Sequence, residues 1–183
     1  MTSSSPVALA ESATLTGLPR VLGIDIALDK TGIAAASGVT WTSKGGKGDE
    51  RLHRLYMDIL GAGREADAAI IEDLPTHAMS AGLTGRAQGV ARMALWKLGI
   101  PYVTVSPATL KKWATGVGNA KKPAMIARAK DIAANTLGVS HWEPTDDEAD
   151  AYLLRVLGIT RLTGGALEAK VKWDSWIDAG WLE

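Results

Sequence analysis

Apolar residues along the chain fall into short continuous runs and into longer segments with helical periodicity. A short apolar run bounded by charged residues, glycine or proline is typical of a buried strand. Such runs occupy residues 21–27, 33–42, 66–75 and 101–106. The turn signal Ser37-Gly38 divides the second run into two strands, so the sequence predicts about five strands.

Segments in which apolar residues recur every three or four positions are typical of amphipathic helices. They occupy residues 48–63, 83–99, 107–116, 121–138, 145–158 and 166–179. Because the helix over 83–99 connects two of the apolar runs, those two strands are predicted to be parallel. The order of elements predicts an α/β fold in which a mixed central sheet of about five strands is flanked by helices.

The length of 183 residues suits one domain, predicted over residues 20–183. Residues 1–19 are rich in Ser and Thr and are predicted to be a flexible leader, and 159–183 are predicted to be a C-terminal helical extension. The first residues lack the basic region of a signal peptide, and no apolar run is long enough to span a membrane. We therefore expect no membrane partner. The absence of cysteine excludes disulfides and cysteine-based zinc sites and agrees with a cytoplasmic location.

Positive charge is concentrated in the middle of the chain, although the formal net charge is zero. No Asp or Glu occurs between Leu74 and Lys130. The basic residues of this span are Arg86, Arg92, Lys97, Lys111, Lys112, Lys121, Lys122, Arg128 and Lys130. A basic surface beside an acidic spot is what an enzyme acting on a polyphosphate needs. The alternative is an ordinary solvated surface.

Acidic residues occur at three places where an otherwise apolar element ends or begins. Asp25 lies inside the run 21–27, Glu72 follows an apolar stretch, and Asp147 and Asp150 lie in the first turn of the helix 145–158. A carboxylate in a buried strand is costly unless it has a partner. Because three elements each supply such a group, we expect the carboxylates to converge.

Residues Thr145 and Glu148 form a capping-box pattern, which makes Thr145 the predicted N-cap of the helix 145–158. Asp147 and Asp150 are then on one helix face. The helix dipole stabilises such acids by only about 0.3–1 kcal/mol each, too little to hold four carboxylates together. Oxygen ligands without a His or Cys pattern point to Mg²⁺ or Mn²⁺ rather than zinc.

Several of these acids also have a simpler structural interpretation. Asp146 is explained as a helix N-terminal charge, Glu148 as the capping partner, and Asp29 as a turn residue. For Asp147 and Asp150 the alternative is a pair of solvated first-turn acids. Asp25 is the hardest to explain without a function.

The helix predicted over 83–99 carries a second, narrow apolar stripe formed by Gly89, Met93 and Trp96. The wide stripe of this helix is expected to face the sheet, so the second stripe needs a second partner. One interpretation is contact with another element of the same chain, such as the C-terminal helix. The other is a helix-to-helix homodimer contact.

Five stretches of the chain match the motifs of one known family in its order and spacing. They are Gly23-Ile24-Asp25 with Thr31-Gly32, Ile70-Ile71-Glu72, Gln88-Gly89-Val90-Ala91, Lys111 through Lys122 with Thr115-Gly116 and Gly118-Asn119-Ala120-Lys121-Lys122, and Asp147-Glu148-Ala149-Asp150-Ala151. With them the chain resembles the RuvC-type Holliday-junction resolvases of the RNase H-like nuclease superfamily. Each motif is weak alone, but five in order over about residues 21–158 are specific.

This resemblance implies an RNase H-like fold, a homodimer and a metal-dependent endodeoxyribonuclease that resolves Holliday junctions by paired symmetric nicks. The products would carry 5′-phosphate and 3′-hydroxyl ends. The resemblance implies two Mg²⁺ ions per site, for which Mn²⁺ would substitute, held by Asp25, Glu72, Asp147 and Asp150. Lys122 matches a family lysine close to the scissile phosphate, which gives it a catalytic role.

Other basic residues are predicted to contact the DNA backbone. These are Lys111, Lys112 and Lys121, together with Lys122 and, as a further candidate, Arg86. The stripe of Gly89, Met93 and Trp96 lies on the helix that family members use for dimerisation. No convincing glycine-rich phosphate loop is present, so no nucleotide cofactor is expected.

The chain departs from the family pattern at two places. Ile26-Ala27 stands where the family usually has Pro-Gly, and the loop Asp73–His77 lacks the aromatic residue that family members often carry there. A broader branched-DNA or flap nuclease of the same fold is therefore the first alternative. A nuclease for RNA–DNA hybrids is another, and a junction-binding protein without catalysis is a third, although the four intact carboxylates argue against it.

Overall fold

The computed structural model describes residues 7–8, 17–74, 81–137 and 141–164. In this part of the chain a six-stranded sheet has the order β1-β4-β3-β2-β5-β6. Its strands are β1 (Val7–Ala8), β2 (Val21–Asp25), β3 (Lys30–Ala34), β4 (Val39–Lys44), β5 (Ala68–Glu72) and β6 (Tyr102–Val105). Strands β1 to β4 pair antiparallel, whereas β5 pairs parallel with both β2 and β6. The predicted mixed sheet is confirmed, with the two-residue β1 as an additional strand.

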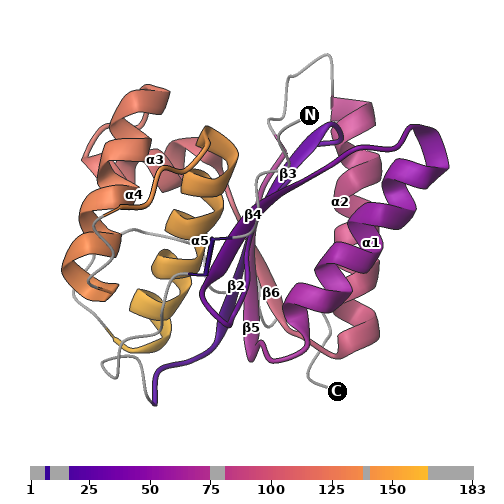
Figure 1. Ribbon diagram of the computed structural model, residues 1–183, viewed down its shortest axis with the longest axis horizontal. Helices are drawn as coiled ribbons and strands as arrows, with labels where there is room; N and C mark the ends of the chain where they lie inside the picture. Colours follow the sequence, from indigo (N-terminus) through magenta and orange to yellow (C-terminus); the bar gives the residue numbers. More distant parts are fainter. Residues whose placement is uncertain (1–6, 9–16, 75–80, 138–140, 165–183) are drawn as a thin grey trace.

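Helices cover both faces of the sheet (Figure 1). They are α1 (Gly48–Gly63), α2 (Ala81–Leu98), α3 (Pro107–Thr115), α4 (Lys122–Leu137) and α5 (Asp146–Leu162). Helices α1 and α2 lie together on one face, and α5 lies on the other face with α3 and α4 packed outside it. The predicted α2 crossover between parallel strands is confirmed. Among the described residues, no helix has both the length and the apolar character needed to cross a bilayer.

Strand β2 is buried on both faces, which explains its continuous apolar sequence. Val21 belongs to the core between the sheet and α5, where Ile70 and Tyr152 also lie. Leu22 and Ile24 point into the other core, between the sheet and the α1–α2 layer. Asp25 is the last residue of this strand, so it lies at the end of the sheet, where the two cores stop.

Two glycines allow α5 to lie in backbone contact with the sheet. A Cβ atom at Gly23 would overlap the carbonyl oxygen of Ala151, and one at Gly32 would overlap that of Asp147. Gly32 is also the cross-strand partner of Asp25. The close approach of α5 therefore brings the backbone of Asp147 beside the end of β2.

A buried arginine holds the turn that follows Asp25. Arg51 of α1 is only 4% exposed. Its Nε donates to the Leu28 carbonyl at 2.7 Å, and its Nη2 donates to the Ser43 carbonyl at 3.0 Å and to the Thr31 hydroxyl at 3.4 Å. Because charged hydrogen bonds are among the stronger ones in proteins, this guanidinium ties the β2–β3 turn, β3 and β4 to α1.

Two predicted boundaries are wrong for reasons of packing. Strand β3 begins at Lys30 rather than at residue 33, because the non-apolar Thr31 and Gly32 are buried by Arg51 and by α5. Helix α5 continues past Gly158, whose missing side chain makes room for Val21 and Ile70. The predicted helix over 166–179 lies outside the described residues, and the division into leader, domain and extension stays a prediction.

The backbone contact of α5 leads to a stability prediction. Gly23→Ala should lower the free energy of unfolding by about 1–3 kcal/mol, because the new Cβ forces α5 away from β2. Gly61→Ala is the matched control: Gly61 is an exposed position of α1, where an added methyl group would meet no other atom within 4 Å. That change should be neutral or stabilising by up to about 1 kcal/mol. Urea denaturation of the three proteins measures both effects, and equal stability of the two variants would contradict the tight contact.

Candidate active site

The ends of two neighbouring parallel strands bring Asp25 and Glu72 together. Ile24 of β2 is in register with Ile71 of β5, so the next residue of each strand is an acid. The two carboxyl groups are close enough for each to affect the pKa of the other. The predicted convergence of these two acids is therefore found at the end of the sheet.

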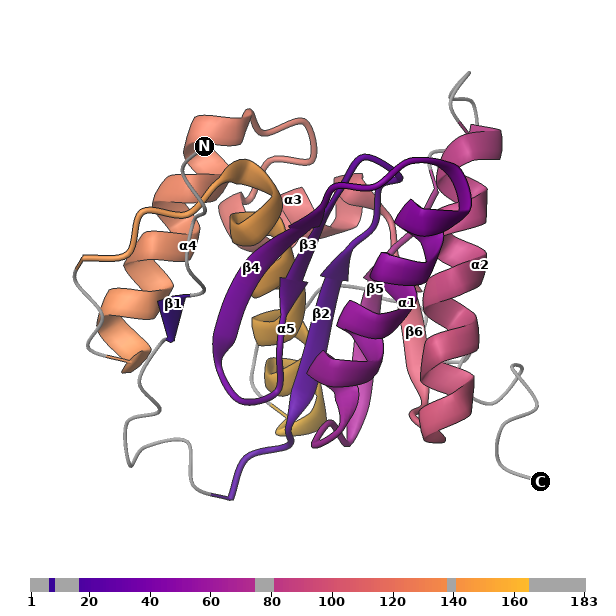
Figure 2. The same cartoon turned by 45° about the vertical axis from the view of Figure 1, so that its right-hand side comes forward.

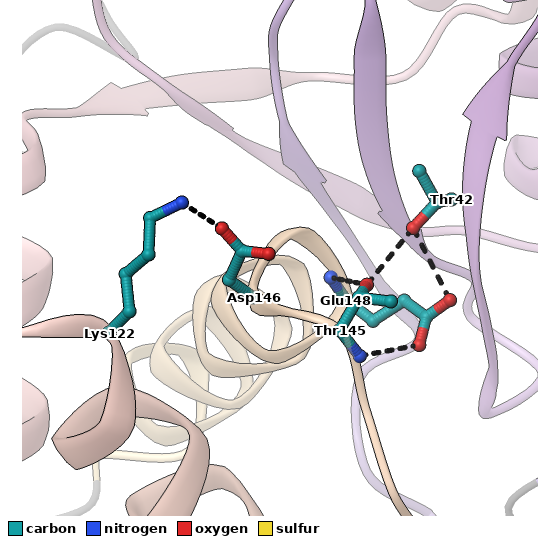
Figure 3. Close-up of polar contacts among 5 residues, drawn as sticks. All are labelled: Thr42, Lys122, Thr145, Asp146 and Glu148. Carbon is teal, nitrogen blue, oxygen red and sulfur yellow. Dashed lines mark hydrogen bonds and ion pairs between the residues drawn. The ribbon is translucent and has the colours of Figure 1, made fainter.

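Helix α5 begins at this same end, where β2 finishes and α1 starts (Figure 2). Its capping box is present: the Glu148 amide donates to the Thr145 hydroxyl at 3.2 Å, and the Thr145 amide donates to the Glu148 carboxylate at 3.1 Å. Thr42 of β4 bonds to Glu148 at 3.3 Å and lies 3.1 Å from the Thr145 hydroxyl (Figure 3). The first turn of α5, which carries Asp147 and is followed by Asp150 in the next turn, is thereby fastened to the sheet.

The charges of the four acids interact strongly. Burial is the main cause that raises the pKa of Asp25 well above its ordinary value, followed by the charges of Glu72, Asp150 and Asp147 and the Glu72 hydrogen bond. Burial also raises the pKa of Glu72, although the Asp25 hydrogen bond and the charge of Lys111 act in the opposite direction. All four acids therefore belong to one electrostatic group.

The two acids of α5 show the same behaviour. Burial and the charge of Glu72 raise the pKa of Asp150 to about 7. Burial and the charge of Asp146 raise the pKa of Asp147. Without a counter-ion this group binds protons at pH values where ordinary carboxyl groups are ionised. Asp147 and Asp150 are half-buried, which argues against a fully solvated pair of acids.

The donor atoms of the group suit a hard divalent cation. The Oδ1 atom of Asp150 is buried and has no hydrogen-bond partner, and a buried polar atom without a partner is costly. Four carboxylates are the oxygen ligands that Mg²⁺ and Mn²⁺ prefer. Within the described residues, however, no three His, Cys, Asp or Glu side chains are grouped around one point as metal ligands. The acids supply suitable donor atoms, but their side chains are not arranged in a complete coordination geometry.

Lysines surround this group from several elements. Lys122, at the start of α4, forms an ion pair with Asp146 (Figure 3). Lys111 of α3 lies close enough to Glu72 and Asp150 for its positive charge to oppose the rise in the pKa of both. Asp146, interpreted from the sequence as a helix-end charge, is thus also the partner of Lys122, and this contact lowers its pKa.

The other predicted DNA contacts are placed less centrally. Lys112 and Lys121 are exposed on the α3–α4 side of the site. Arg86 is exposed near the start of α2, where it lines a pocket of about 230 Å³ with Leu28 and Asp29. Since α2 covers the opposite face of the sheet from α5, Arg86 lies on the other side of the sheet from Lys111 and Lys122. His77 lies outside the described residues.

One residue near the acids was not predicted from the sequence. Lys30, the first residue of β3, lies close enough to Asp146 and Asp147 for its charge to help lower the pKa of Asp146 and to oppose the rise in the pKa of Asp147. The sequence places it in a turn-like stretch between Asp29 and Gly32, without any motif. The signal that would have found it is the strand register, which only the folded sheet supplies.

The narrow stripe on α2 is exposed. Met93 and Trp96 are 56% and 57% exposed, and together with Gly89 and Arg92 they line a shallow apolar depression of about 430 Å³. Arg92 donates a 2.6 Å hydrogen bond to the Tyr102 hydroxyl and so borders this surface. No other element in the described part of the chain covers it.

Comparison with known proteins identifies relatives of one kind. No family model matches the chain. The crossover junction endodeoxyribonuclease RuvC of Chloroflexus aggregans is 31% identical over 123 residues, which cover 65% of this chain and 73% of that protein. The RuvC protein of Gloeobacter violaceus is 31% identical over 124 residues, with 66% and 69% covered. That of Rhodopirellula baltica is 30% identical over 154 residues, with 75% and 84% covered.

Solved structures show the same fold. The Thermus thermophilus RuvC structure matches with a TM-score of 0.62 at 18% identity, and the same protein in complex with a Holliday junction substrate matches with a TM-score of 0.65 at 20% identity. Each match covers 79% of this chain and 96% of the other chain. The RNase H-like fold expected from the sequence is thereby confirmed.

The raised pKa of Asp150 leads to a prediction for the protein in EDTA. Because its folded-state pKa of about 7 exceeds the ordinary 3.8, folding favours the protonated form, and stability is lost as the pH rises from about 4 through 7. Asp150→Asn should therefore raise the free energy of unfolding at pH 8 by roughly 1–3 kcal/mol, a value reduced for solvent screening. The gain should shrink towards pH 4.

Asp146→Asn is the matched control, because Lys122 lowers the pKa of Asp146. A depressed pKa stabilises the fold above the unfolded-state value, so this substitution should reduce stability at pH 8. Thermal denaturation of both variants between pH 4 and 8 measures the two opposite signs. A loss of stability at pH 8 in Asp150→Asn would show that this carboxylate is not strained.

Proposed function

The chain belongs to the RuvC family of crossover junction endodeoxyribonucleases, and we propose that it is a metal-dependent enzyme that resolves Holliday junctions by paired symmetric nicks. The observation that carries this proposal is the group of four interacting carboxylates at one end of the sheet. Three separate elements supply them, and lysines flank them on exposed surface. This is the arrangement that hydrolysis of a phosphodiester needs.

The four acids, Asp25, Glu72, Asp147 and Asp150, would together hold two Mg²⁺ ions. Two such ions, when bound, activate the attacking water and stabilise the leaving 3′-oxygen of an in-line displacement. The buried Oδ1 of Asp150 would gain the partner that it lacks. Products with 5′-phosphate and 3′-hydroxyl ends follow from this chemistry.

The lysines would serve the phosphate group rather than the metal. Lys122 would exchange its ion pair with Asp146 for the scissile phosphate and stabilise the negative charge that develops there. Lys111, close to Glu72 and Asp150, would contribute to the same field. Lys112 and Lys121 are exposed and would position the DNA backbone without reading its sequence. Arg86 would contact DNA only on the side of the sheet that α2 covers.

We propose a homodimer formed through the exposed α2 stripe of Gly89, Met93 and Trp96. An isologous contact through this stripe would give the dimer a two-fold axis. Because α2 and α5 lie on opposite faces of the sheet, both sets of carboxylates would stay open to DNA. Two sites related by this axis would cut a symmetric junction twice. A DNA substrate and the cysteine-free composition favour the cytoplasm of a bacterium or of a phage-infected host.

A broader branched-DNA or flap nuclease is the second candidate function. It is favoured by the absence of phenylalanine from the whole chain, including the loop that follows Glu72. Without an aromatic side chain at the junction centre, the enzyme would hold other branched structures as readily. The four carboxylates would have the same role in either case.

Cleavage of synthetic DNA by wild-type protein and Asp25→Asn tests the function. We expect metal-dependent symmetric nicks in a labelled four-way junction, with Mg²⁺ or Mn²⁺ but not with EDTA. Asp25→Asn should lower the cleavage rate at least a thousandfold while junction binding survives, since the variant loses the carboxylate whose pKa responds to the other three acids. Asp29→Asn, which removes an exposed charge from the next turn, should cleave like wild type.

A flap and a linear duplex are included in the same assay. Equal cutting of flap and junction would replace the resolvase with the broader nuclease. Binding of the junction without cutting by the wild-type protein would contradict enzymatic activity. Cleavage by Asp25→Asn would contradict the proposed ligand set.

The proposed dimer has its own test. Trp96→Glu should convert the protein to a monomer, because it places a charge in an apolar contact. Met57→Glu is the matched control at a similarly exposed residue of α1 (51%) and should stay dimeric. Sedimentation equilibrium measures the mass, and a cruciform plasmid reports linear product for paired cuts and open circles for single cuts. A monomeric wild-type protein would contradict the interface.

A further inference from the structure

Two lysines stand directly opposite each other at the end of the β3–β4 hairpin. Lys30 of β3 and Lys44 of β4 are cross-strand partners, and both are exposed. Like charges placed directly opposite each other in a sheet are destabilising. Within the described residues, neither lysine is in a salt bridge or a side-chain hydrogen bond. The pair therefore concentrates positive charge at a cost to the fold.

The side chains of this pair lie on the same face of the sheet as α5. Side chains two residues apart on a strand share a face, so Lys44 is on the side of Thr42, which bonds to the cap of α5. Lys30 is likewise on the side of Gly32, which contacts the backbone of Asp147. Gly32 is in turn the partner of Asp25. Each lysine is two residues, roughly 7 Å along its strand, from the residue that contacts α5.

The opposite flank of the carboxylates is also basic. Lys122 meets Asp146 from α4 (Figure 3), and Lys30 approaches Asp146 and Asp147 from the hairpin. The start of α5 is therefore enclosed between two positively charged elements. A DNA strand that passes over the carboxylates would contact the start of α4 on one side of the scissile phosphate and the β3–β4 hairpin on the other side.

We propose that Lys30 and Lys44 form a phosphate-binding pair that holds the DNA strand on the far side of the scissile phosphate from Lys122. The inference rests on the proposed nuclease function and adds the β3–β4 hairpin to the DNA-contact surface. A backbone phosphate between the two ammonium groups relieves their repulsion and gains two charge-assisted contacts. Such contacts position the strand and carry no sequence preference.

The double variant Lys30→Gln/Lys44→Gln tests this pair. Junction affinity, measured in EDTA over a range of salt concentrations, should fall about tenfold, and the slope of log Kobs against log salt should fall by about 1–2. The rate of cleavage at saturating junction should change less than threefold, so the loss appears in KM. Melting temperature should be unchanged or raised, which separates lost binding from misfolding.

Two matched controls accompany the variant. Lys30→Arg/Lys44→Arg keeps both charges and should retain wild-type affinity and salt slope. Arg64→Gln removes one exposed charge after the end of α1, at the other end of the sheet from the carboxylates. It should leave affinity unchanged, whereas Lys44→Gln alone should weaken it.

The outcomes are separable from the proposed function itself. Unchanged affinity and salt slope in the double Gln variant, with a wild-type enzyme that cuts junctions, would overturn the phosphate pair alone. A fall in maximal rate at unchanged affinity would also overturn it and would make the lysines partners of Asp146 and Asp147 instead. A wild-type protein that neither binds nor cuts branched DNA would refute the nuclease proposal on which the pair depends.

Discussion

The backbone contact between α5 and the sheet is the constraint on which the rest of the structure depends. Helix α5 reaches β2 and β3 closely only because Gly23 and Gly32 have no side chains. Cores pack at high density and do not absorb an extra methyl group without displacement. This one contact fixes the position of the Asp147 backbone relative to Asp25. The arrangement of the carboxylates therefore depends on how α5 packs against the core.

The same contact forces acidic groups together that repel one another. Burial is the main cause that raises the pKa values of Asp25, Glu72, Asp147 and Asp150, and the charges of neighbouring acids add to it at Asp25, Asp147 and Asp150. The repulsion among the acids is opposed by interactions outside the group. These are the capping box of α5, the bonds from Thr42 to this capping box, and the hydrogen bonds of the buried Arg51 to the β2–β3 turn. A site that is costly without a counter-ion is suited to bind one tightly, because cation binding removes the repulsion that the fold maintains.

The two faces of the sheet separate two tasks. On the α5 face lie the carboxylates, the lysines of α3 and α4, and the Lys30–Lys44 pair. The exposed stripe of Met93 and Trp96 lies on α2, on the other face. A partner bound to α2 therefore does not compete with a polyanion at the carboxylates. This separation is a property of the layered architecture, in which α2 and α5 pack on opposite faces of the sheet.

Much of this organisation was predictable because it depends on local pattern. Continuous apolar runs identify the buried strands, the Thr145–Glu148 pattern identifies the start of α5, and a carboxylate inside an apolar strand marks Asp25 as costly to bury. These signals depend on neighbours in sequence, so the order of elements, the mixed sheet and the convergence of the acids follow from them.

The tertiary structure alone decided which residues meet across elements. The ion pair of Lys122 with Asp146, the proximity of Lys111 to Glu72, and the opposition of Lys30 to Lys44 join segments with no local relation. Arg86, grouped with the other basic residues by charge, lies across the sheet from them. The extension of β3 to Lys30 and of α5 past Gly158 depends on burial by Arg51 and against Val21. Register and face are set by packing between distant segments, and a one-residue shift in register reverses every side chain, which is why local pattern could not supply them.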